Sequence, residues 1–467
     1  VVGGPQSGKS TLLRTILCGL SLTHTPAEIQ LYCLDFGGGT VSALRDLPHI
    51  GGVAGRLDAA AVRRTVGELA SLLADRERQA ASDATTSEQS HVFLVVDGWS
   101  TLRGEYDDLE PVLADLATRG LSYRIHIIAS ASRWMDFRPG TRDLFGSRLE
   151  LRLGDPADTL VSRQAAGSVP EREPGRGITA DGLHFLAARP TIAGQDPAGQ
   201  DLVQLIAHGW SGPKAAPVRL LPEVVPPADL DPGEGLRIPI GLAESDLGTV
   251  HIDFTVEPHA LLFGDGESGK SSFLRGLAAA VVARFAPEQA RIIIVDYRRS
   301  LLGAVNTDHL IGYGTAGEVT AELIESAAGY LHRRLPGPDV TPQQLRDRSW
   351  WTGPELFVLV DDYDLVAAGP SNPLLPLLEY LPQARDIGLH LILTRRCGGA
   401  SRALYEPIIQ RLRELSAPGL ILSGSPEEGP LLGAVRPRPL PPGRAALVTR
   451  RDGVRLVQLA YPPPVTD

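Results

Sequence analysis

The sequence predicts two α/β domains in tandem, each with a mainly parallel sheet flanked by helices. Two observations lead to this prediction. Near-continuous apolar strands alternate with helical stretches along the 467 residues, which is the pattern of parallel sheets covered on both faces. The same order of landmarks then recurs roughly 260 residues later, which indicates an internal duplication.

The composition fits a folded protein and excludes several classes. With 43% hydrophobic and 21% charged residues, the chain can bury large cores and is not expected to be disordered. The formal net charge is −10, whereas a protein that binds nucleic-acid phosphates usually has a basic bias. The three cysteines form no disulfide or metal-binding pattern, so we expect a reduced, intracellular protein. No apolar run is long enough to span a bilayer.

The first copy begins with a short apolar strand, Val1-Val2, then a glycine-rich turn and a helix. Two further apolar strands end in Asp35 and Asp97. Between them, residues 59–79 repeat apolar side chains at helical spacing, which predicts a crossover helix over the sheet. The chain opens without a methionine, so we expect it to be a piece of a longer protein.

The second copy repeats this order. Two short strands, 236–241 and 248–255, precede the strand 260–263 that leads into its glycine-rich turn, and residues 315–335 predict the matching crossover helix. Equivalent residues of the two copies lie 261 to 268 positions apart. These pairs are Lys9 and Lys270, Asp35 and Asp296, Asp97 and Asp361, His126 and His390, and Arg176 and Arg444.

Residues 213–235 lie between the copies and contain six prolines. Such a density of proline favours an extended, semi-rigid linker over a helix or a strand. We therefore place the first domain at residues 1–212 and the second at residues 236–467.

Both copies carry the motif G-x-x-x-x-G-K-[ST] between an apolar strand and a helix. In such a P-loop the glycines let backbone N–H groups converge on phosphate oxygens at a helix N-terminus, so each copy is predicted to bind ATP. Lys9 and Lys270 would bridge the terminal phosphates, and Ser10 and Ser271 would hold Mg²⁺. The other predicted ligands are Gly3, Gly4, Pro5, Gln6, Ser7, Gly8 and Thr11, and Gly264, Asp265, Gly266, Glu267, Ser268, Gly269 and Ser272.

Asp97 and Asp361 each close an apolar strand and are predicted to complete the Mg²⁺ shell, although such carboxylates can also simply end a strand. Hydrolysis further needs a group that orients the attacking water, commonly the next residue. That residue is Gly98 in the first copy and Asp362 in the second. We therefore expect weak hydrolysis in both domains, with Asp362 as the candidate catalytic carboxylate.

Ring-forming ATPases also need an arginine that a neighbouring domain supplies. Alignment of the two copies pairs Arg148 with Gly419, so Arg148 is the candidate catalytic arginine, acting on a preceding domain. The alternative is an ordinary surface or ion-paired arginine. Asp35 and Asp296, at the ends of their strands, are predicted to orient the loops that follow.

The order of these motifs resembles the FtsK/SpoIIIE branch of RecA-like motor ATPases, and within it the EccC-class ATPases of type VII (ESX) secretion. The residues that carry the resemblance are Val1–Ser10, Leu34–Gly39, Val96–Trp99 and Leu149–Pro156, and Gly264–Ser271, Val360–Tyr363 and Ser423–Pro426. The resemblance implies two tandem RecA-like P-loop NTPase domains. They correspond to the second and third ATPase domains of that class, either cut from a longer chain or encoded separately.

The same resemblance implies ATP and Mg²⁺ as cofactors and a set of partners. The last domain would recruit small helical-hairpin substrates through a C-terminal export signal. The other partners would be further ATPase domains and a membrane secretion complex, assembled as a hexameric ring at the inner face of the cell membrane. A missing N-terminal part or a partner would provide the anchor.

Two other functions remain open at this point. The DNA translocases of the branch have Gln-Arg-Pro after the strand that contains His126 or His390, whereas this chain has Ser130–Arg133 and Thr394–Cys397. This substitution and the acidic net charge favour protein export over translocation of double-stranded DNA. The third hypothesis is an assembly platform in which ATP is only a structural ligand.

Overall fold

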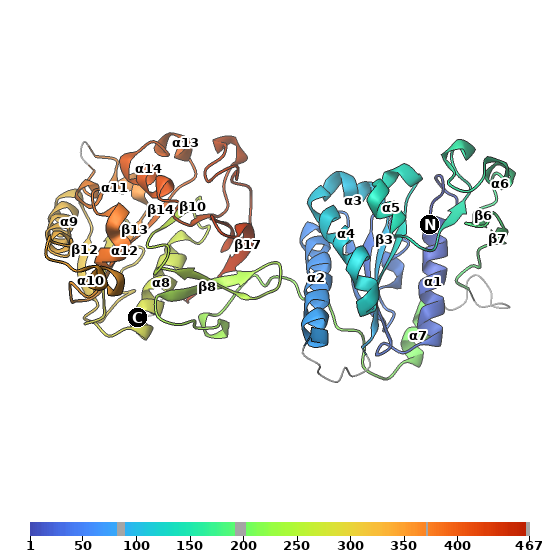
Figure 1. The fold of residues 1–467 in the computed structure, drawn as a ribbon, viewed down its shortest axis with the longest axis horizontal. Helices are drawn as coiled ribbons and strands as arrows, with labels where there is room; N and C mark the ends of the chain where they lie inside the picture. The colour runs from blue at the N-terminus through green and yellow to red at the C-terminus, as the bar shows by residue number, and fades with distance from the viewer. Residues whose placement is uncertain (82–88, 192–201, 370–371, 464–467) are drawn as a thin grey trace. The chain divides into compact units, whose positions relative to one another are not determined.

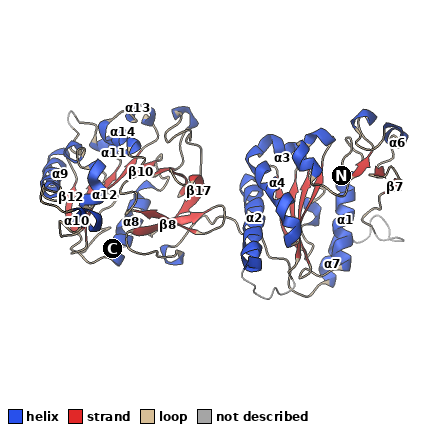
Figure 2. Cartoon of the chain, viewed as in Figure 1, coloured by secondary structure: helices blue, strands red, loops and turns tan. Residues whose placement is uncertain are grey.

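The computed structural model describes residues 1–81, 89–191, 202–369 and 372–463. It forms two compact units, Val1–Leu220 and Leu221–Asp467. Each unit is built from strands with helices packed around them, which confirms the predicted fold class (Figures 1 and 2).

A parallel sheet forms the centre of the first unit. Its strands, in spatial order, are β2 (Ile50–Gly55), β1 (Ile29–Asp35), β3 (His91–Asp97) and β4 (Ile125–Ser130). The segment that leads into the P-loop lies beside β4, because Val2 forms parallel bridges to Ala131 and Glu150. Glu150 belongs to a small antiparallel sheet of β5 (Leu149–Leu151), β6 (Arg176–Thr179) and β7 (His184–Leu186).

Helices cover both faces of this sheet (Figure 2). Along β1, Leu31 and Cys33 join one apolar cluster while Tyr32 and Leu34 join another, so the alternating side chains supply two cores on opposite faces. The helices of the unit are α1 (Lys9–Thr23), α2 (Ala59–Ala81), α3 (Trp99–Glu105), α4 (Glu110–Arg119), α5 (Pro139–Asp143), α6 (Arg163–Ser168) and α7 (Leu202–Gly209).

The second unit contains one larger sheet with the same plan. Its strands, in spatial order, are β12 (Leu310–Gly314), β11 (Ala290–Asp296), β13 (Glu355–Asp361), β14 (Leu389–Arg395), β10 (Ala260–Phe263), β15 (Gly419–Ile421), β16 (Arg444–Thr449), β17 (Gly453–Leu459), β8 (Arg237–Ala243) and β9 (Thr249–Asp253). The first six strands are parallel to one another and the last four pair antiparallel. The predicted strands that precede the second P-loop are β8 and β9.

Helices flank this second sheet as well. They are α8 (Lys270–Arg284), α9 (Gly317–His332), α10 (Pro342–Asp347), α11 (Tyr363–Val366), α12 (Ala384–Ile387), α13 (Ala400–Ala403) and α14 (Pro407–Glu414). The predicted crossover helices 59–79 and 315–335 are α2 and α9.

The sheet registers of the two copies agree at the strand that leads into each P-loop. Val2 pairs with Glu150 in the first unit, and Phe263 pairs with Ile421 in the second. These two pairs place Arg148 and Gly419 at equivalent positions, as the sequence alignment did. The duplication is therefore present in the fold as well as in the motifs.

The proline-rich segment is extended, with one short 3₁₀ turn at Pro227–Asp229. Its first part belongs to the first unit, where Val218 N–H donates to the carbonyl of Gly51 (3.0 Å). Its later part belongs to the second unit, where Arg444 Nη2 donates to the carbonyls of Leu221 and Pro222 (both 3.1 Å). The division between compact units thus falls inside this segment, which is hydrogen-bonded on both sides of it.

Candidate nucleotide-binding sites

The two P-loops have the same backbone, and a left-handed glycine sets it. Gly8 (φ 101°) and Gly269 (φ 114°) immediately precede α1 and α8. A Cβ atom on Gly8 would lie 2.9 Å from the backbone nitrogen of Gly175, and one on Gly269 would lie 3.2 Å from that of Gly443. Only glycine combines this dihedral angle with so close a neighbour, so glycine is required where each loop enters its helix.

In the first site the P-loop lysine contacts the loop itself. Lys9 Nζ donates to the carbonyls of Gly3 (2.7 Å) and Gly4 (2.9 Å). Burial lowers the pKa of Lys9, and the nearby Asp97 and Asp136 carboxylates oppose that shift. The ammonium group is thus held at the mouth of the loop by weak carbonyl acceptors that phosphate oxygens can replace.

Asp97 has one carboxylate oxygen satisfied and one without a partner. Ser130 Oγ donates to Asp97 Oδ1 and accepts from the N–H of Gly98 (3.0 Å). Asp97 Oδ2 is buried and has no hydrogen-bond partner among the described residues. An orphaned buried carboxylate oxygen is costly without a cation, so this position fits the Mg²⁺ that the motif implies.

A cavity of about 520 Å³ connects these groups. It is lined by Pro5, Gln6, Ser7, Gly8, Lys9, Ser10, Thr11 and Asp97, and by Phe36, Gly37, Gly98, Ser100, Thr101, Ser130, Ala131, Ser132 and Pro174. Most of the predicted ligands of the first site are thus brought together, whereas Gly3 and Gly4 lie behind them as carbonyl acceptors.

The second site holds its metal-binding candidates in a tighter network. Ser271 Oγ donates to Asp361 Oδ2 (2.6 Å), and Thr394 Oγ1 donates to Asp361 Oδ1 (2.7 Å). Burial raises the pKa of Asp361, and these two hydrogen bonds oppose the shift. A hydroxyl from the P-loop and a carboxylate from the strand end therefore already meet where Mg²⁺ would bind, and their chemistry fits that hard cation.

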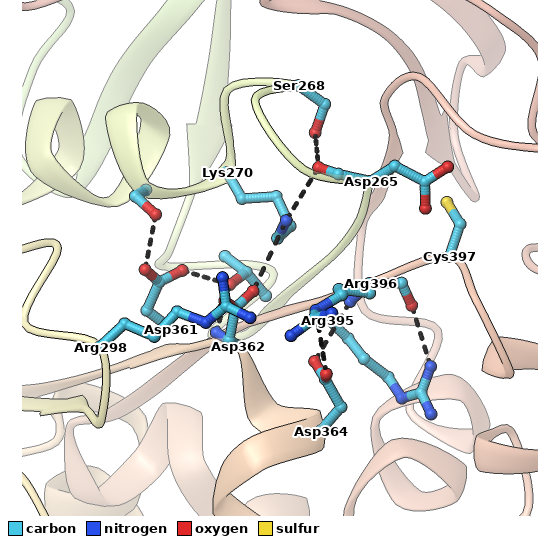
Figure 3. A network of polar contacts seen from close by, with 12 residues as sticks. Asp265, Ser268, Lys270, Arg298, Asp361, Asp362, Asp364, Arg395, Arg396 and Cys397 are labelled. Carbon is cyan, nitrogen blue, oxygen red and sulfur yellow. Dashed lines mark hydrogen bonds and ion pairs between the residues drawn. The ribbon is translucent and has the colours of Figure 1, made fainter.

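Asp362 lies in the second site between two cations (Figure 3). Its Oδ1 is 3.5 Å from Lys270 Nζ and its Oδ2 is 3.0 Å from Arg298 Nε. Lys270 Nζ also donates to the carbonyl of Asp265 (3.0 Å). Lys270 and Asp362, both candidate site residues from the sequence, lie close together here, whereas the sequence did not predict Arg298 as their neighbour.

The sequence also missed a second cavity, of about 320 Å³, beside the second P-loop. It is lined by Glu267, Gly269, Lys270, Ser271 and Ser272, and by Glu223, Val224, Pro442, Gly443, Gln458, Leu459, Ala460 and Tyr461. The segment with Glu223 is held there by Gln458, whose Nε2 donates to the Glu223 carbonyl (2.8 Å). These residues carry no motif, so only the fold could place them next to the helix that follows the P-loop.

The predicted loop-orienting carboxylates do orient loops. Asp35 accepts from the N–H groups of Gly37 (3.1 Å) and Ser42 (2.7 Å). Asp296 accepts from those of Arg298 (3.0 Å) and Leu301 (2.7 Å). Both carboxylates thus fix a loop at the edge of a nucleotide-binding candidate site.

The candidate catalytic arginine, Arg148, does not line the cavity at the P-loop of its own unit. Arg148 Nε donates to the carbonyl of Phe145 (3.0 Å) and its Nη2 to that of Arg142 (3.3 Å). The role of Arg148 on a preceding domain stays a prediction.

His126 and His390, which the sequence placed in strands, stack on Phe93 and Phe357 respectively. His390 is fully buried, whereas His126 is only partly buried. Both belong to the packing of their sheets.

Comparison with known proteins places this geometry in a family. The model of the FtsK/SpoIIIE family matches residues 1–195 and 237–311. The chain belongs to that family. Within the family it matches EccC proteins, with 51% identity to the ESX secretion system protein EccC of Thermomonospora curvata and 37% to the ESX-1 secretion system protein EccCb1 of Mycolicibacterium smegmatis, each over 99% of the chain.

The extent of the match differs between these EccC relatives. The chain spans 37% of the Thermomonospora relative but 84% of EccCb1. A solved structure described as Thermomonospora curvata EccC (ATPases 2 and 3) in complex with a signal sequence peptide superposes with a TM-score of 0.93, covering 99% of this chain and 87% of that one. The prediction of an EccC-class chain that corresponds to the second and third ATPase domains is confirmed. Within the residues that the structure describes, no helix is both long and apolar enough to cross a membrane.

Proposed function

We propose that this FtsK/SpoIIIE-family chain binds ATP with Mg²⁺ at both P-loops and serves as the nucleotide-regulated part of a type VII secretion ATPase. The observation that carries the proposal is the pairing of each P-loop with a buried carboxylate, Asp97 or Asp361, whose strand neighbour supplies a hydroxyl. Lysine, serine and carboxylate at these positions are the groups that hold a triphosphate and its metal.

We expect weak hydrolysis at both sites. In the first site Gly98 has no side chain to orient water. In the second site Asp362 is already ion-paired with Lys270 and Arg298, so its carboxylate oxygens are not free to orient a water molecule. When bound, Mg²⁺ would neutralise phosphate charge, while Ser10 with Asp97 and Ser271 with Asp361 would hold it.

Nucleotide binding is tested by calorimetric titration of the purified chain with Mg²⁺ and a non-hydrolysable ATP analogue. The parent chain is expected to bind two equivalents, Lys9→Ala and Lys270→Ala one each, and the double variant none. Binding of two equivalents by the double variant would place the nucleotide elsewhere and contradict the proposal.

We also propose that the second domain recruits small helical-hairpin secreted substrates through their C-terminal signal. The support is the signal sequence peptide named in the description of the Thermomonospora EccC structure, together with an apolar cavity of about 690 Å³ in the second unit. The cavity is lined by Pro227, Ala228, Leu230, Pro232, Pro239, Ile240, Phe273, Gly276, Leu277, Ala279, Ala280, Ala283, Arg284, Ala460 and Pro462. Its composition suits apolar side chains of a short peptide.

Ala280→Asp would place a charge in this cavity and is expected to weaken binding of a fluorescent signal peptide at least tenfold. Ala286→Asp is the matched control, because Ala286 is exposed and does not line the cavity. Equal binding by both variants would exclude this cavity as the docking site. Assembly into a hexameric ring at the inner face of the membrane remains part of the same proposal.

A further inference from the structure

The two nucleotide-binding candidate sites differ at two positions near the P-loop. One is the residue after the strand-end carboxylate, which is Gly98 in the first site and Asp362 in the second. The other is the second residue after the loop-orienting carboxylate, which is Gly37 in the first site and Arg298 in the second. The equivalence of Gly37 and Arg298 follows from their hydrogen bonds, because each N–H donates to the preceding aspartate, Asp35 or Asp296.

The first site has no room for a side chain at its position. A Cβ atom on Gly37 would lie 2.3 Å from Asp97 Oδ2, far inside contact distance. In the second site the loop leaves space, and Arg298 extends from it to form the ion pair with Asp362 (Figure 3). Two glycines in one copy are therefore replaced by an ion-paired arginine and aspartate in the other.

Arg298 is fixed at both ends. Its backbone is held by Asp296, which also accepts from Leu301 N–H and from the hydroxyl of Tyr313 (2.8 Å). Its guanidinium is held through Nε by Asp362 Oδ2. No hydrogen bond occupies its two terminal nitrogens among the described residues, and its side chain is 48% exposed. A guanidinium anchored at Nε keeps both terminal nitrogens, with four N–H groups, for a further acceptor.

That acceptor would lie beside the P-loop lysine. Lys270 Nζ and the Arg298 guanidinium contact the two oxygens of one carboxylate, so both cations lie on the same side of the P-loop mouth. Lys270 is the residue that a P-loop directs at the β- and γ-phosphates. A terminal phosphate oxygen that replaces Asp362 as the partner of Lys270 would therefore also lie close to the Arg298 guanidinium.

We propose that Arg298 is a ligand of the terminal phosphate in the second site, with Asp362 as the residue that positions it. The proposal rests on nucleotide binding at the second P-loop and names the group that distinguishes ATP from ADP there. Asp362 then holds an arginine in place and does not act on water. In the second site the third phosphate is thus contacted by a residue of the same domain. The first site has no equivalent arginine.

The test uses the whole chain with Lys9→Ala, which leaves only the second P-loop able to bind, and measures the dissociation constants of Mg·ADP and of a Mg-bound non-hydrolysable ATP analogue. Arg298→Ala is expected to lower the preference for the triphosphate about tenfold while leaving ADP affinity within about twofold. Arg299→Ala, one residue along the same exposed loop, is the matched control and is expected to leave both constants unchanged. Arg298→Lys is expected to restore only part of the preference, because an ammonium group cannot bridge two acceptors in a fixed fork.

The Asp362→Asn variant serves as a second background. It distinguishes direct contact of Arg298 with the phosphate from a role in which Arg298 only neutralises the charge of Asp362. In Asp362→Asn there is no carboxylate to neutralise, and Arg298→Ala is still expected to lower the preference for the triphosphate by about threefold. No effect in that background, or equal changes in ADP and ATP-analogue affinity in the parent, would overturn the assignment. Failure of the Lys9→Ala chain to bind either nucleotide would instead contradict the proposed nucleotide binding, on which this assignment depends.

Discussion

The two candidate sites of this chain share a backbone and differ in what surrounds it. The first has glycine at positions 37 and 98, and its carboxylate Asp97 keeps a buried oxygen without a partner. The second has Arg298 and Asp362, and its carboxylate Asp361 accepts hydrogen bonds at both oxygens. Duplication thus preserved the P-loop while the groups around it diverged. The nucleotide binding that we propose for both sites therefore need not be accompanied by the same chemistry in each.

The largest predicted difference concerns which unit a nucleotide stabilises. At a thousandfold excess over its dissociation constant, a ligand stabilises the folded state by about 4 kcal/mol. Lys270→Ala is therefore expected to remove this protection from β11 and β13 while leaving that of β1 and β3 intact, and Lys9→Ala to do the reverse. Hydrogen exchange resolved by peptide, with and without Mg²⁺ and an ATP analogue, measures both. Equal loss in the two units would contradict independent sites.

Acid is expected to destabilise the second unit through the buried His259. His259 is buried in that unit, where Nε2 donates to the Leu381 carbonyl (3.2 Å) and Nδ1 accepts from Leu391 N–H (3.1 Å), so the ring is neutral. Burial lowers the pKa of His259 to about 4. Because the folded pKa lies below the unfolded value, this contribution to stability is present above pH 6.5 and is lost as the pH falls towards 4, by roughly 3 kcal/mol in all.

Denaturant unfolding of the second unit at a series of pH values tests this expectation. His259→Gln is expected to lower stability at neutral pH and to flatten its dependence between pH 6.5 and 4. The same slope in the variant and the parent would show that other groups control the acid response.

The hydroxyl groups beside the two carboxylates give a smaller and unequal effect. Ser130 is the only side chain among the described residues that hydrogen-bonds Asp97, whereas Asp361 accepts from both Thr394 and Ser271. Ser130→Ala is therefore expected to destabilise its unit by about 2 kcal/mol and Thr394→Val by about 1 kcal/mol. Denaturant titration followed by exchange in β3 and β13 compares them, and a larger loss for Thr394→Val would reverse the proposed asymmetry.

Much of the fold was predictable because its signals are local. The apolar strand that ends in Asp361 and the helical spacing of residues 315–335 are each contained within one segment, and the repeat then fixed their order in both copies. The contacts that distinguish the two sites could not be predicted in this way. Arg298 and Asp362 are 64 positions apart in the sequence, and only the adjacent carboxyl ends of β11 and β13 bring them together. Glu223, in the Pro-rich segment, lines the cavity beside the second P-loop. The composition of that segment predicts that it is extended, but not that it lies against this P-loop.

The smallest expected effect comes from restoring a carboxylate to the first site. Gly98→Glu supplies the group that commonly orients water, yet we expect the turnover of ATP to stay within about threefold of the parent rate. The arginine that stabilises the transition state, typically supplied by a neighbouring domain, contributes roughly 10³–10⁵ in rate where such residues have been studied, and a carboxylate does not replace it. In addition, Gly98 has φ 98° and a Cβ atom there would lie 3.2 Å from Phe36 Cβ, so the glutamate is held in a strained position. Steady-state phosphate release in a Lys270→Ala background, with Gly98→Ala as the control for strain, isolates the first site. A rate increase of a hundredfold or more would mean that the missing carboxylate, and not a missing arginine, limits hydrolysis in this half of the molecule.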